Sequence, residues 1–88
     1  MRFFVVRHYN EDEKELFDTH KSKYPALKMK WWEGRILYDA TYYGDDYEEA
    51  SGLAEAAFED RKLARQLAED VGGRVYREKY YTPLLVDR

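Results

Sequence analysis

The chain contains no cysteine, and this absence excludes several chemistries. Disulfide bonds, thiolate nucleophiles and cysteine-ligated metal sites are all ruled out. A fold without disulfides needs no oxidising compartment, so the sequence is compatible with the cytoplasm, where we expect the protein to act. Long apolar runs are also missing. The run from Phe3 to Val6 is too short for a signal-peptide core or a membrane span, and we expect no membrane partner.

Histidine occurs only at positions 8 and 20, and neither stands in a pattern typical of a catalytic or metal site. His20 falls on the apolar stripe of a predicted helix, which favours a packed or boundary residue. His8 ends a predicted strand, where a neighbour such as Tyr9, Asp39 or Tyr42 would allow proton transfer. The serines and threonines have no evident base partner. We therefore expect no metal, no cofactor and no enzymatic activity, and keep an enzyme using His8 as an alternative.

The composition is that of a single small globular domain spanning residues 1–88. Hydrophobic residues make up 44% of the chain and charged residues 38%, which excludes a disordered chain. The aromatic fraction of 17%, with nine tyrosines, is high. Such residues favour strands and can also form binding surfaces, because tyrosine has an apolar body and a polar tip.

The first half of the chain predicts a strand, a helix and a hairpin. Residues 2–8 are rich in strand-forming residues. Asn10 can cap a helix that should end by about Lys23, because Pro25 disfavours helical angles in the residue before it. Residues 28–32 and 35–43 read as two strands joined by a tight turn at Glu33 and Gly34.

The second half predicts a long helix and a last strand. Asp45 and Glu48 resemble a capping pair, and Gly72 with Gly73 is a strong helix stop. Residues 74–81 then read as a strand before Pro83. The resulting order is that of the ferredoxin-like split βαβ fold of the α+β class. It implies a four-stranded antiparallel sheet with two helices on one face and with residues 2–8 paired to residues 35–43.

Two residues do not fit a straight helix through this region. At 100° per residue Asp60 falls inside the apolar stripe, while Phe58 falls outside it. Either the chain breaks near Asp60, which then caps a shorter helix over residues 61–71, or the helix is continuous and Phe58 lies outside the core. Helix propensity favours the continuous helix.

The charges are unevenly distributed along the chain, whose net charge is −3. The predicted strands are basic and residues 44–72 are acidic. A run of carboxylates can dock on a basic protein surface. We therefore expect a small non-enzymatic binding or regulatory protein that acts on another protein, of the type of a phage accessory protein or inhibitor. The residues assigned to the protein partner are Asp45, Asp46, Glu48, Glu49 and Phe58.

A second function stays open, because basic and aromatic residues can share the sheet face that the helices leave uncovered. Such a face can neutralise phosphates and stack bases, so single-stranded nucleic acid is the alternative partner. The candidate residues are Lys28, Lys30, Trp32, Arg35, Tyr43, Arg77, Lys79 and Tyr81. The same face would leave apolar area around Trp32, Leu37, Tyr43 and Tyr81, and we expect a homodimer to bury it, which is also what an α+β-barrel enzyme would require.

Overall fold

The computed structural model of the protein describes residues 1–38 and 48–86. Within these residues, four strands and two helices follow one another in the order strand, helix, strand, strand, helix, strand, with a short 3-10 turn after the first and the last strand. The elements are β1 (Phe3–Tyr9), η1 (Glu11–Glu13), α1 (Lys14–Lys23), β2 (Lys28–Tyr38), β3 (Glu48–Phe58), α2 (Arg61–Val71), β4 (Arg74–Arg77) and η3 (Glu78–Tyr80).

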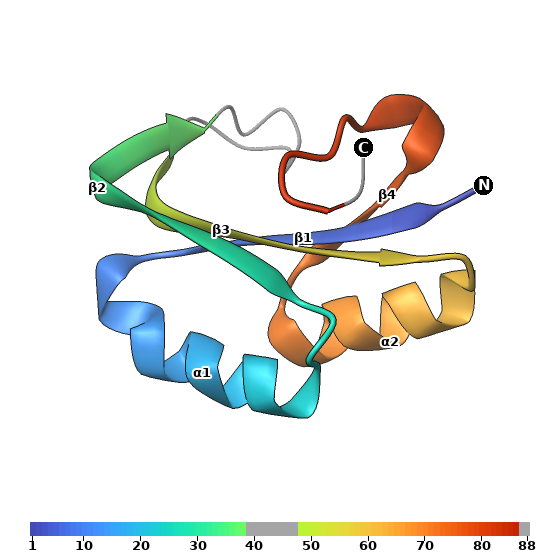
Figure 1. The fold of residues 1–88 in the computed structure, drawn as a ribbon, viewed down its shortest axis with the longest axis horizontal. Coiled ribbons are helices and arrows are strands. Elements are labelled where there is room, and N and C mark those ends of the chain that lie inside the picture. Colours follow the sequence, from blue (N-terminus) through green and yellow to red (C-terminus); the bar gives the residue numbers. More distant parts are fainter. Residues whose placement is uncertain (39–47, 87–88) are drawn as a thin grey trace.

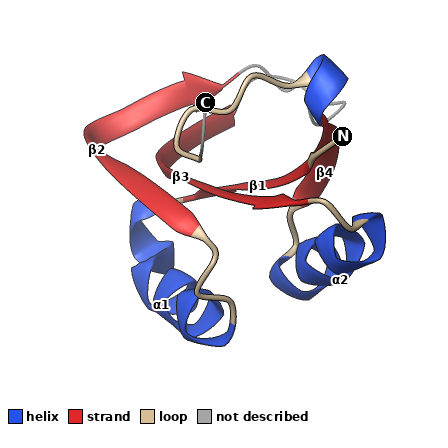
Figure 2. Cartoon of the chain, turned by 45° about the vertical axis from the view of Figure 1, so that its right-hand side comes forward, coloured by secondary structure: helices blue, strands red, loops and turns tan. Residues whose placement is uncertain are grey.

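The strands form one antiparallel sheet in the order β2-β3-β1-β4. Both helices lie on the same face of this sheet (Figure 1). The predicted fold class, a ferredoxin-like α+β arrangement, is therefore confirmed. The two central strands are β1 and β3, and β2 is an edge strand (Figure 2).

The third strand is not where the sequence placed it. The two predicted hairpin strands belong largely to one strand, β2, and β1 pairs with residues 52–58 rather than with residues 35–43. Gly34, predicted as a turn, has a φ of 74° within an irregular stretch of β2 between Trp31 and Ile36. Residues 39–43 lie outside the described residues.

Residues 48–58 form a strand although their alanines and glutamates favour a helix. In the central strand β3, the small residues Gly52, Ala54 and Ala56 share the face that carries the helices. Their small size leaves room for the helices and for Trp31. Tertiary packing therefore overrides a weak local preference here.

Asp60 marks the break between β3 and α2. Its side chain accepts a hydrogen bond from the backbone N–H of Lys62 at 2.8 Å, and α2 runs over residues 61–71 to a left-handed Gly72. This break explains why Phe58 and Asp60 do not fit the apolar stripe of a straight helix. The prediction of a shorter helix over residues 61–71 is confirmed, and the prediction of a continuous helix is wrong. Phe58 ends β3 and packs against the core under the helices.

The first helix and the last strand follow their sequence signals more closely. Glu13 accepts a hydrogen bond from the backbone N–H of Asn10 at 2.9 Å, and α1 ends at Lys23 as predicted. Lys21 donates to the carbonyl oxygens of Pro25, at 2.7 Å, and Leu27, which fixes the turn that leads into β2. The last strand is shorter than predicted, because it ends at Arg77 and continues as η3.

The indole of Trp31 lies directly over the backbone of Gly52, its partner on β3. A Cβ atom at position 52 would stand 2.6 Å from Cε3 of Trp31 and 2.8 Å from Cζ3. The ring packs edge to face against Phe17 and Tyr9 in the core between the sheet and α1. The missing side chain at position 52 therefore makes room for the tryptophan that joins β2 to this core.

We expect Gly52→Ala to lower the free energy of unfolding by about 1–3 kcal/mol, because the added methyl group overpacks Trp31. Chemical denaturation measures this loss. Gly34→Asn is the matched control, because no atom lies within 4 Å of a Cβ there. Asn tolerates the left-handed backbone, and the control should cost less than about 1 kcal/mol. A Gly52→Ala protein as stable as the parent would show that Trp31 does not need this space.

Candidate functional site

The residues predicted to bind nucleic acid are only partly brought together. Lys28 and Lys30 lie opposite Glu55 and Leu53 in the register with β3, on the face that the helices leave uncovered. Trp32 packs against the apolar cluster of the same face, which also contains Tyr81.

The remaining basic residues of that set lie elsewhere. Arg77 pairs with Phe3 at a position that belongs to the helix-covered face, and Lys79 lies in η3. Arg35 forms an exposed ion pair with Glu49 at 3.3 Å. Tyr43 lies outside the described residues.

The face of the sheet opposite the helices is covered by residues 81–86 (Figure 1). Val86 is buried there against Phe4, Val6 and Leu53. Tyr81 stacks on Tyr76, with ring centroids 5.2 Å apart. This segment was not anticipated from the sequence.

Glu55 holds the segment in place. Its carboxylate is fully buried and accepts hydrogen bonds from the backbone N–H groups of Leu84 at 3.0 Å, Leu85 at 2.6 Å and Val86 at 3.2 Å. The hydroxyl of Tyr81 also donates to it. A buried carboxylate is tolerated only when such donors replace water. Reading residues 48–58 as a strand would have revealed this glutamate, because it then shares a face with Leu53 and Ala57.

We expect Glu55→Ala to lower the free energy of unfolding by roughly 2–4 kcal/mol, because three backbone N–H groups lose a charged acceptor. Chemical denaturation gives the loss, and hydrogen exchange should show the amides of residues 84–86 unprotected. Glu59→Ala, at an exposed glutamate just after β3, is the control and should change stability by less than about 0.5 kcal/mol. Amides 84–86 that stay protected in Glu55→Ala would contradict this role.

The residues predicted to meet a protein partner do not form an acidic helix face. Glu48 begins β3, and Glu49 is engaged with Arg35. Phe58 is half-buried in the core, while Asp45 and Asp46 lie outside the described residues. Because β3 lies between β1 and β2, its backbone edges are already occupied.

The two histidines lie in different surroundings. His8 pairs with Leu53 in β1, on the face that residues 81–86 cover. His20, expected as a packed or boundary residue, lies at the boundary of the core, where its Nδ1 is 2.8 Å from the hydroxyl oxygen of Tyr9. Burial raises the pKa of Tyr9, and the neighbouring Arg7 opposes this shift. Burial lowers the pKa of His20 below its ordinary value of 6.5, and the positive charge of Arg7 lowers it further.

We expect the free energy of unfolding to fall as the pH is lowered from about 7 to about 5, because the unfolded chain binds a proton at His20 before the folded protein does. The contribution of this lowered pKa is fully present above 6.5 and is lost as the pH falls through the folded value. His20→Gln should lose less stability over this range. Urea denaturation of both proteins at the two pH values measures the difference, and equal losses would assign the effect to another group.

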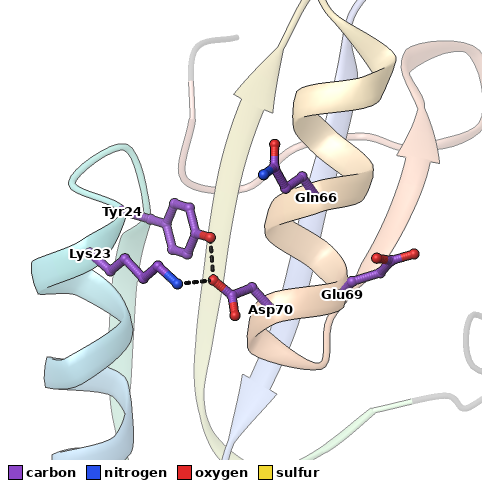
Figure 3. Close-up of a pocket in the computed structure, with 5 residues that line it drawn as sticks. All are labelled: Lys23, Tyr24, Gln66, Glu69 and Asp70. Atoms are coloured by element: carbon purple, nitrogen blue, oxygen red, sulfur yellow. Dashed lines mark hydrogen bonds and ion pairs between the residues drawn. The ribbon is translucent and has the colours of Figure 1, made fainter.

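A hollow of about 460 Å³ lies between the ends of α1 and α2, lined by Lys23, Tyr24, Gln66, Glu69 and Asp70. Figure 3 shows Lys23 and Tyr24 pointing across it towards Asp70. Asp70 accepts hydrogen bonds from Lys23, at 2.6 Å, and from the hydroxyl of Tyr24. These two donors lower the pKa of Asp70. Lys23, Tyr24 and Asp70 thus satisfy one another and connect the two helices.

The outer edge of β2 is a different kind of surface. Residues 28–31 pair with β3 in unbroken register, and no described residue pairs with their other side. The opposite edge strand, β4, has only four residues and ends in η3. The edge of β2 therefore exposes the backbone N–H and C=O groups that can add a further strand.

Three exposed lysines surround this edge. Lys28 and Lys30 flank it on one face, and the Nζ atom of Lys30 lies 5.5 Å from the ring centre of Trp32. On the other face the Nζ atom of Lys14 lies 5.2 Å from the ring centre of Trp31. We call residues 28–31 with these lysines the β2 edge.

No known protein family, curated protein or solved structure matches the chain. In the ranges 1–38 and 48–86, no three histidine, cysteine, aspartate or glutamate side chains are grouped to hold a metal ion. No helix in the same ranges is long and apolar enough to cross a membrane. Function is therefore inferred from the geometry of the described residues.

Proposed function

We propose that the protein is a small non-enzymatic binding protein, an accessory factor or inhibitor, that acts by holding an extended segment of another protein along the β2 edge. The observation that carries this proposal is the regular pairing of residues 28–31 with β3 on one side only. A strand added at such an edge gains affinity from main-chain hydrogen bonds and specificity from alternate side chains.

The coverage of both sheet faces supports the edge as the docking surface. The helices cover one face, and the segment 81–86 covers the apolar part of the other. Trp32 and Tyr81 pack within this second layer instead of forming an open platform for bases. Among the described residues, the nucleic-acid alternative is therefore supported only by exposed Lys28 and Lys30 beside Trp32.

The dimer and enzyme alternatives have less support. The face expected to drive dimerisation is occupied by Val86 and its neighbours, although Leu37 remains 69% exposed. His8 lies on this same face, opposite Leu53, and the layer over Leu53 leaves less room for the pocket between two packed sheets that the enzyme alternative needs.

The proposal is tested by selecting random peptides displayed on phage against the immobilised protein. We expect the enriched peptides to slow hydrogen exchange of the amides of residues 28–31, because those amides enter a new ladder of hydrogen bonds. Protection confined to the hollow between α1 and α2, or no enrichment at all, would count against docking at the β2 edge.

Two proline variants provide the control. Successive strand residues direct their backbone groups to opposite sides, so Met29→Pro and Lys30→Pro differ in which edge they interrupt. The variant that removes an N–H group pointing away from β3 should keep the circular dichroism spectrum of the unaltered protein but no longer bind the peptides. If neither variant folds, the exchange map of the unaltered protein decides.

A further inference from the structure

The three lysines of the β2 edge carry information about its partner, because no acid in residues 1–38 or 48–86 forms an ion pair with them, and the carboxylate of Glu55, opposite Lys28, is bound by residues 84–86. Lys14, Lys28 and Lys30 are exposed and form no ion pair with any residue in 1–38 or 48–86. By contrast, Arg35, farther along β2, is paired with Glu49. Positive charge without an ion pair in these ranges therefore lies beside the regular part of the edge, as it also does on α2 at Arg61, Lys62 and Arg65.

We infer that the segment bound at the β2 edge is an acidic strand in which carboxylates alternate with apolar residues. This inference rests on the proposed function. A strand paired with residues 28–31 directs alternate side chains to the two faces of the sheet. Those on the face of Lys28 and Lys30 meet two ammonium groups, and an opposite charge directly across a strand pair is favourable.

The other face of the edge calls for apolar side chains. Met29 and Trp31 are half-buried there and pack against the core under the helices. Apolar side chains of an added strand would extend that packing, with Lys14 over the outer part of Trp31. The irregular stretch between Trp31 and Ile36 interrupts the regular register, so the bound segment is short.

A second copy of this chain is a poor occupant of the same edge. Antiparallel pairing of two β2 strands through residues 28–31 would bring Lys28 and Lys30 against lysines of the other copy. Like charges opposite each other destabilise a strand pair. The lysines therefore disfavour self-pairing and favour a different, acidic chain.

The test uses the whole protein and five fluorescein-labelled peptides with capped ends. One alternates glutamate and valine. Two matched peptides carry glutamine or lysine in place of glutamate, and a fourth keeps glutamate but has N-methylated valines.

Fluorescence anisotropy gives the Kd values. We expect the glutamate peptide to bind about tenfold more tightly than the glutamine peptide, with an advantage that salt reduces, and the lysine peptide to bind weakest. N-methylation should abolish binding when the methylated N–H groups face β2. Because the register of the bound peptide decides whether the valine or the glutamate N–H groups face β2, a fifth peptide carries the methyl groups on its glutamates.

Charge-reversal variants localise the effect. Lys28→Glu combined with Lys30→Glu should raise the Kd of the glutamate peptide roughly 30-fold, because two attractive pairs become repulsive. The same variant should bind the lysine peptide more tightly than the unaltered protein does. Lys62→Glu combined with Lys79→Glu changes the net charge equally at exposed lysines of α2 and η3. This control should keep the Kd within about twofold of the unaltered protein.

The outcomes separate the two proposals. If all three charge types bind alike and N-methylation abolishes binding, the edge docks strands and the acidic preference is wrong. If no peptide binds, or if N-methylation has no effect in both registers, docking at the β2 edge is itself wrong. A single-stranded oligothymidylate that binds more tightly than the glutamate peptide, and that is lost with Lys28→Glu and Lys30→Glu, would assign the lysines to nucleic acid instead.

Discussion

The buried carboxylate of Glu55 is the interaction on which the second layer of this fold depends. Its four donors, three backbone N–H groups and the hydroxyl of Tyr81, all come from one short segment that joins no strand of the sheet. Without such an acceptor the exposed face of the sheet would carry the side chains of Phe4, Val6 and Leu53 uncovered. One charged residue in a central strand thus converts an open two-layer fold into one that is covered on both sides.

This closure determines where another molecule can bind. An open sheet offers two faces and two edges, but here the helices cover one face and the segment 81–86 covers the apolar part of the other. Of the edges, β4 is short and leads directly into η3. Of the two edge strands in the described residues, β2 is the longer, with 11 residues against four, and its residues 28–31 pair with β3 in unbroken register. The case for a protein partner therefore comes from what the fold leaves uncovered, not from the acidic segment that first suggested it.

The sequence predicted the order of elements and the fold class because both depend on strong local signals. Asn10 and Glu13 start the first helix, Pro25 follows its end, and Gly72 terminates the second. The position of the third strand could not be read locally, because alanine and glutamate favour a helix and only pairing with β1 and β2 makes residues 48–58 extended. The mismatch of Phe58 and Asp60 did signal the break. The role of residues 84–86 depends on backbone N–H groups, which every sequence supplies, so no residue pattern announces it.

The lysines of the β2 edge combine two effects that are usually considered separately. Positive charge on an edge strand discourages pairing with uncharged or similarly charged strands, which protects a protein against aggregation. The same charge leaves the backbone groups available to a strand that brings carboxylates. An edge flanked by lysines can therefore still pair with another strand, but it disfavours strands that bring no carboxylates. Specificity then arises because unsuitable strands are repelled. Gly34 and the irregular stretch after Trp31 separate the part of β2 that the lysines flank from residues 36–38, where pairing with β3 resumes, so a strand added in one continuous register would extend only along the lysine-flanked part.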